Sequence, residues 1–194
     1  MSRIYCAGPL FNESERSEMA EIARILEEAG HTTFLPQRDG LEFARLMPEL
    51  RLQGLDTERA DRALLQAIFS LDVYQLLKAC DAVVANINGR VPDEGTVVEA
   101  ALAWHAGKPL VLYKADSRSL LNGSDNPMLA GLGTFEVLDN LASLPSAMAK
   151  QLTKSNVARV AETLRNGEQI AHARAESSGL VHLASVLAKR FEPA

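Results

Sequence analysis

Short apolar runs alternate with segments of helical periodicity along the first 140 residues. The run Arg3–Ala7 closes with Gly8-Pro9 and predicts a buried first strand. Further buried strands are predicted at 31–36, 82–87, 109–113 and 135–138. Between them, apolar positions recur on one helix face from an Asn12 cap to Gly30, from a Thr57 cap to about Ala79, and from Gly95 to His105.

This alternation of strand and helix predicts the fold class. Near-continuously apolar strands are typical of a parallel sheet covered by helices on both faces, so we expect an α/β, doubly wound sheet of about five strands. Residues 37–56 are expected to form a polar, irregular connection, because Pro48 and Gly54 interrupt any long helix. After residue 145 the pattern is helical. We therefore expect an α/β domain over 1–144 and a helical C-terminal extension over 145–194.

The chain's charge and composition exclude several classes of function. The net charge of −5 is concentrated in residues 1–149, whereas 150–194 is mildly basic, so the body is ill suited to a phosphate backbone and we expect no nucleic acid. No apolar stretch approaches 18 residues, and the N-terminus has no leader pattern, so we expect no membrane contact and a cytoplasmic protein. Cys6 and Cys80 lack metal-binding or disulfide spacing.

Ligands of such folds bind beyond the carboxyl ends of the strands, which places the loops Gly8–Asn12, Gln37–Gly40 and Asn88–Gly95 at the candidate site. Glu99 lies in an apolar helical run beside small residues, although Thr96-x-x-Glu99 also reads as a capping box that serves only the helix N-terminus. Asp72 falls where an amphipathic helix favours an apolar residue, but a solvated face would equally hold it.

Asp93 and Tyr5 are also open to two interpretations. Asp93 precedes a helix start, where the macrodipole alone favours a carboxylate, and Tyr5 could be a core aromatic. Because all four side chains converge on one rim, the set suits glycosyl transfer, with one carboxylate as nucleophile and another acid to protonate the departing group.

Five motifs occur in an order that resembles the nucleoside 2-deoxyribosyltransferase family. They span about residues 3–139: Ile4–Phe11, Leu35–Gly40, Asp72 nine residues before Asp81, Asp93–Glu99, and Asn126–Leu129. The resemblance implies a flavodoxin-like sheet and exchange of a nucleobase on 2'-deoxyribose through a deoxyribosyl-enzyme ester, without metal or cofactor. Ala100 stands where the family usually has Gly, and the tail from 145 is longer than typical members need.

The resemblance also implies roles for individual residues. Glu99 matches the nucleophile, Tyr5 the residue that orients it, and Asp72 and Asp93 the acids that hold the substrate and handle its proton. Candidate substrate contacts in the matched loops are Gly8, Phe11, Gln37 and Asp39. Asn126 and Met128 match residues lent to a neighbouring subunit's site, so the resemblance implies a homo-oligomer built from dimers, including trimers of dimers, with deoxynucleosides and free nucleobases as substrates.

Two rival functions remain open on the sequence. The first is a 2'-deoxynucleoside 5'-monophosphate N-glycosidase on the same fold, which must hold a phosphate dianion; Pro9 removes one N–H from the first loop, whereas Ser14, Arg16 and Thr96 could serve. The second is a non-catalytic nucleotide-binding module in which Glu99 only caps its helix. An exposed, capping Glu99 would favour the module, and a pocket-facing Glu99 near Asp93 would favour catalysis.

Overall fold

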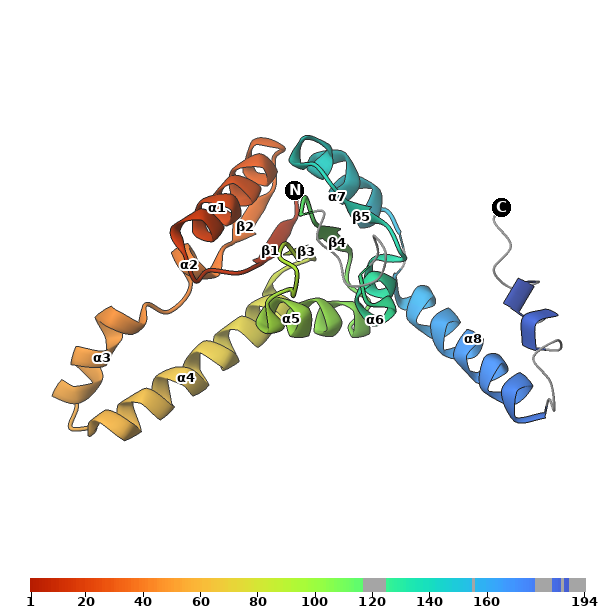
Figure 1. Cartoon of the computed structure of the whole chain (residues 1–194). Helices are drawn as coiled ribbons and strands as arrows, with labels where there is room; N and C mark the ends of the chain where they lie inside the picture. The colour runs from red at the N-terminus through yellow and green to blue at the C-terminus, as the bar shows by residue number, and fades with distance from the viewer. Residues whose placement is uncertain (117–124, 155, 177–182, 186, 189–194) are drawn as a thin grey trace. The chain divides into compact units, whose positions relative to one another are not determined.

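The computed structural model describes residues 1–116, 125–154, 156–176, 183–185 and 187–188. The chain divides into two units, Met1–Lys154 and Ser155–Ala194, which are described separately (Figure 1). Within the described residues, no helix is long and apolar enough to cross a membrane.

Five parallel strands form the sheet of the first unit. They are β1 (Arg3–Ala7), β2 (Thr32–Phe34), β3 (Ala82–Asn86), β4 (Leu110–Tyr113) and β5 (Val137–Leu138). The order is β2-β1-β3-β4-β5, and every neighbouring pair is parallel. The predicted α/β fold class is confirmed, with the flavodoxin-like order. In this order the connections diverge at β1 and β3, where such sheets bind their ligands.

Helices cover the two faces of the sheet and bury two apolar cores. On one face, α1 (Glu13–Glu28) and α7 (Leu144–Leu152) contribute Met19, Ile22, Leu26, Leu144 and Met148. On the other face, α5 (Glu94–His105) and the residues that follow α4 (Thr57–Tyr74) pack against β1 and β3. Figure 1 shows α1 and α7 on the side of the sheet opposite α5. The strands β1, β3 and β4 are buried on both faces, which explains their near-continuously apolar sequences.

The predicted first helix and its cap are confirmed. Asn12 accepts a hydrogen bond from the Glu15 backbone N–H at 3.0 Å, and the Glu15 carboxylate accepts from the Asn12 N–H, which completes a capping box. Gly30 follows the helix with φ of 87°, a conformation that glycine adopts at little cost.

The expectation of an irregular connection over 37–56 is wrong. This segment contains α2 (Pro36–Asp39) and α3 (Phe43–Leu52), with Pro48 inside α3. Proline removes one helical hydrogen bond, but Leu46, Met47 and Leu50 are half-buried on the helix that packs against α4. The gain from this packing outweighs the local preference against a helix, which the sequence pattern alone did not reveal.

The second long helix reaches Ala79 as predicted, but its capping residue and the form of its last turn differ from the prediction. Its N-cap is Asp56, whose carboxylate accepts from the Arg59 N–H at 2.8 Å, and not Thr57. At its C-terminal end the helix widens into a π-helical turn, η1 (Gln75–Ala79), which buries Leu76. Such turns are rare and frequently lie at functional sites.

The remaining helical elements of the first unit follow β4 in the chain. These are α6 (Pro127–Ala130), the 3-10 turns η2 (Gly131–Gly133) and η3 (Leu141–Ser143), and α7. Because α7 places Leu144 and Met148 in the core, the first unit runs to Lys154, ten residues past the expected domain limit. The second unit contains α8 (Asn156–Glu176).

Candidate active site

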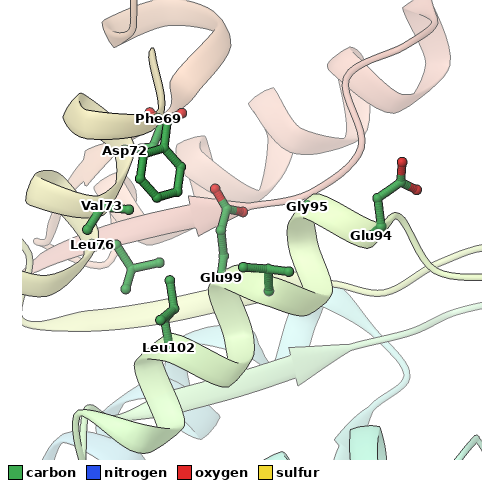
Figure 2. A pocket seen from close by; sticks show the side chains of 9 residues that line it. Phe69, Asp72, Val73, Leu76, Glu94, Gly95, Glu99 and Leu102 are labelled. Carbon is green, nitrogen blue, oxygen red and sulfur yellow. The ribbon is translucent and has the colours of Figure 1, made fainter. Parts of the chain in front are cut away.

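A pocket of about 260 Å³ opens between the C-terminal end of α4 and the N-terminal half of α5. Figure 2 shows Asp72 and Phe69 on α4 across the pocket from Glu99 and Leu102 on α5. Apolar side chains make most of the wall, and the charged groups are carboxylates. The lining residues are Phe69, Asp72, Val73, Leu76, Glu94, Gly95, Val98, Glu99 and Leu102.

Glu99 is held in this pocket by the first strand. The Tyr5 hydroxyl donates to Glu99 Oε1 at 2.5 Å, and the Tyr5 ring is fully buried and stacked on Phe34 at 5.5 Å between centroids. Since β1 is paired with a strand on each side, its tyrosine ties the carboxylate to the interior of the sheet. The alternative that Glu99 only closes a capping box is wrong, because Asp93 caps α5 and the Glu99 carboxylate faces the pocket.

Burial and neighbouring charge raise the pKa values of the two central carboxyls. The pKa of Glu99 rises to about 7, chiefly through loss of solvation and further through the negative charges of Asp72 and Asp93, against the lowering effect of the Tyr5 hydrogen bond. Burial raises the pKa of Asp72 to about 6. The Tyr5 pKa rises well above its usual range through burial and the charge of Glu99, so its hydroxyl remains a donor.

Asp93 lies at the start of α5 and not on the pocket wall. Its Oδ2 accepts from the Thr96 backbone N–H at 2.7 Å and from the Thr96 hydroxyl at 2.8 Å. This cap orients the first turn of α5, and the charge of Asp93 still acts on Glu99. The structure therefore places Asp72 and Glu99 in the lining of one pocket, with Tyr5 bonded to Glu99 and Asp93 at the start of the helix that carries Glu99, whereas the roles of these residues stay a prediction.

The predicted contacts in the first loop lie outside the pocket lining. A Cβ on Gly8 would overlap Met19 Sδ, so Gly8 allows close packing of the loop on α1. Phe11 is 79% exposed. Substrate contact by these residues stays a prediction.

Gln37 and Asp39 are both engaged within the protein. Gln37 Nε2 donates to the Arg16 carbonyl at 2.8 Å, while its buried Oε1 has no partner among the described residues. Asp39 accepts from the Leu35 N–H at 2.8 Å and pairs with Arg38, which holds its pKa below the usual range. Neither residue lines the pocket, so their role in binding also stays a prediction.

Asn126 and Met128 do not reach this pocket within their own chain. Asn126 caps α6 by accepting from the Met128 N–H at 2.9 Å, and Met128 is 82% exposed. An exposed methionine in the first turn of α6 is available to another molecule.

Sequence reasoning missed two features. Phe69 lines the pocket three residues before Asp72, and this helical spacing was the signal that could have found it. Near the carboxyl ends of β3 and β4, the Glu18 carboxylate accepts from Asn86 Nδ2 at 2.8 Å and from Asn88 Nδ2 at 2.9 Å, and Asn88 Oδ1 accepts from the Ala115 N–H at 2.8 Å. These bonds tie α1 to the loops after β3 and β4.

No three His, Cys, Asp or Glu side chains in the described ranges are grouped to hold a metal ion.

Fold and site together define a parallel α/β protein with a carboxylate-lined pocket beside β1 and β3, the two strands at which the connections diverge. The chain belongs to the nucleoside 2-deoxyribosyltransferase family, whose model matches residues 4–179. This membership supports an enzyme that transfers glycosyl groups and acts on nucleosides and nucleobases.

Solved structures show the same fold. A 2-deoxyribosyltransferase from Bacillus psychrosaccharolyticus is 21% identical with a TM-score of 0.56, covering 74% of this chain and 90% of its own. A conserved protein from Enterococcus faecalis V583 is 20% identical with a TM-score of 0.55, covering 78% of this chain and 99% of its own. A search of curated proteins found no match.

Proposed function

We propose that the protein transfers 2-deoxyribosyl groups between nucleobases through a covalent intermediate on Glu99. The observation that carries the proposal is the Glu99 carboxylate, fixed by Tyr5 at 2.5 Å on the wall of an otherwise mainly apolar pocket. A carboxylate held in one orientation and poorly solvated is suited to attack a carbon that gains positive charge.

The first half-reaction exchanges one bond for another at C1' of the sugar. A Glu99 oxygen forms a bond to C1' while the bond from C1' to the base nitrogen breaks, and the bond electrons leave with the base. In the second half-reaction a nitrogen of an incoming base attacks C1' and the ester bond breaks, which restores the Glu99 carboxylate. The apolar wall limits attack by water on the ester, so that a base is the preferred acceptor.

Asp72 is suited to carry the proton of the base. Its pKa of about 6 lets it donate a proton to the departing base and recover one from the incoming base near neutral pH. It lies on α4, on the pocket wall opposite Glu99. A proton donor has to lie on that side, because the base departs away from the nucleophile. Asp93 caps α5 and so supports the position of Glu99 on that helix. The proposed steps use protein side chains alone.

The charge of the pocket favours a nucleoside over a nucleoside monophosphate. Asp72, Glu94 and Glu99 line it, and none of its described lining residues is basic. A phosphate dianion close to three carboxyl groups would be repelled, whereas an uncharged nucleoside is accepted. The monophosphate hydrolase is therefore the weaker candidate.

The proposal includes a neighbouring subunit. Asn126 and Met128 lie outside the pocket of their own chain, and Met128 is exposed. The family resemblance assigns such residues to an adjoining site. We therefore propose a homo-oligomer built from dimers.

Chromatography of a mixture of 2'-deoxyinosine and adenine tests the activity. We expect wild-type protein to form 2'-deoxyadenosine and hypoxanthine, and Glu99→Ala to form neither. Glu58→Ala is the matched control, because Glu58 is an exposed glutamate at the far end of α4. Incubation with 2'-deoxyinosine alone should leave a deoxyribosyl group on Glu99, detectable by mass spectrometry of the protein. Exchange by Glu99→Ala at the wild-type rate would overturn the nucleophile, and hypoxanthine release without exchange would indicate a hydrolase.

A further inference from the structure

Phe69 is the aromatic residue among those described as lining the pocket, and it is 66% exposed. A phenylalanine that exposed gives up much of the stabilisation it would gain from burial in a core. Leu65, one turn earlier on the same helix, is similarly exposed but does not line the pocket. Val98 is the other strongly exposed apolar side chain among the described lining residues, and of the two only Phe69 carries a ring that could present a flat face to the contents of the cavity.

The placement of Phe69 relative to the two carboxyl groups restricts what could cover its ring. Phe69 and Asp72 are three residues apart on α4 and therefore share one helix face. Figure 2 shows both on the wall that faces Glu99, with Leu76 and Leu102 below them. A flat, partly apolar group inserted here would meet the ring with its face and Asp72 with its edge.

We propose that Phe69 is the stacking platform for the nucleobase of the substrate. The inference rests on the proposed function and adds the residue that orients the base. A base stacked on Phe69 presents a ring nitrogen to Asp72 and leaves its sugar carbon C1' toward Glu99. Every base has a π face, so one aromatic platform accepts both the departing and the incoming base.

Equilibrium binding in a chain that cannot turn over tests the platform directly. 2'-Deoxyadenosine is titrated by calorimetry into the Glu99→Gln protein, and into the same protein with Phe69 replaced. We expect Phe69→Ala to weaken binding by about tenfold, which lies in the lower part of the range for loss of one stacked base. Phe69→Leu should lose as much, because it keeps an apolar side chain without a ring, and Phe69→Trp should restore binding. The loss should be larger for 2'-deoxyadenosine than for 2'-deoxycytidine, since the purine overlaps the ring more.

Leu65→Ala is the matched control and should leave binding unchanged. Thermal unfolding should be the same for both alanine variants, because both side chains are exposed. Wild-type affinity in Phe69→Ala or in Phe69→Leu would overturn the platform, as would failure of the Glu99→Gln chain to bind 2'-deoxyadenosine. A change in sedimentation of Phe69→Ala would assign the ring to a contact between copies and overturn it too.

The exchange assay separates this inference from the proposed function. With Phe69→Ala in the otherwise wild-type chain, we expect KM for the nucleoside to rise about tenfold, in line with the lost stacking, while kcat falls less. Exchange with an unchanged KM would overturn the platform and leave the transferase standing. Ring-dependent binding without any exchange by the wild-type protein would support the platform and overturn the transferase.

Discussion

The bond from Tyr5 to Glu99 couples a buried strand residue to the pH dependence of the site. The Tyr5 hydroxyl stabilises the ionised Glu99 and so opposes the rise of its pKa to about 7. Tyr5→Phe removes this donor without changing the buried ring. We expect the acidic limb of the plot of log kcat/KM against pH, near 7 in the wild type, to move upward by about one unit, the pKa equivalent of a hydrogen bond to a charged group. A lower rate with the limb unmoved would contradict this.

Glu99 also links activity to stability. Its folded pKa of about 7 lies above the ordinary value of 4.5, so the folded state favours the protonated form. The stability that this group contributes is present below pH 4.5 and is lost as the pH rises through 7. Glu99→Gln keeps an acceptor for Tyr5 but carries no charge, so it should be more stable than the wild type at pH 8 by about 1–3 kcal/mol.

Chemical denaturation at pH 8, 6 and 4.5 measures this difference, which should shrink towards zero at the lowest pH. Glu58→Gln, at an exposed position, should show no comparable trend. Equal stability of Glu99→Gln and the wild type at pH 8 would contradict burial of the ionised carboxylate.

The sequence identified Glu99 and Asp72 as candidates because both are charged residues in helical segments with strong apolar periodicity. It could not decide between a cap and a pocket for Glu99, since that choice depends on Tyr5, which is 94 residues away in the chain. Phe69 escaped notice because an aromatic residue in an amphipathic helix fits a core equally well. Only the assembled pair of helices shows that its ring remains exposed.

At the scale of elements, prediction succeeded where signals within a few residues define a helix, and it failed where contacts with distant residues do. Asn12, Glu15 and Gly30 define α1 through bonds within a few residues, so the sequence was sufficient there. Helix α3 was missed because Pro48 argues locally against it, whereas the favourable packing on α4 comes from a distant segment. The π-helical turn η1 was not predicted, because its residues Gln75–Ala79 fit an ordinary α-helix equally well.

Helix α7 determines where the stable α/β unit ends. Leu144 and Met148 are fully buried in the core shared with α1 and β4, so the α/β domain should require them. We expect a chain that ends at Lys154 to keep the unfolding free energy of the first unit. A chain that ends at Ser143 should lose several kcal/mol, because removal of a single buried Leu or Met already costs about 2–5 kcal/mol. Chemical denaturation compares the two, and equal stability would return the boundary to residue 145.

At the scale of the whole molecule, the strand order explains why scattered motifs meet. Parallel strands end at one edge, so Tyr5 on β1 and the loop after β3 approach each other, and the helix that follows this loop brings Glu99 to Tyr5. This part of the site follows from topology and was predictable. Asn126 and Met128 do not follow from it, because α6 lies away from the pocket lining of its own chain.

Mixed oligomers decide whether these two residues complete a neighbour's site. Glu99→Ala and a double variant, Asn126→Ala with Met128→Ala, should each have low exchange activity alone. When the two proteins are unfolded together and refolded, a mixed dimer contains one site with Glu99 from one chain and Asn126 and Met128 from the other. Random pairing makes half of the dimers mixed, so we expect about one quarter of the wild-type activity per site to return. Activity equal to the mean of the separate variants would place all of these residues in a site formed by one chain.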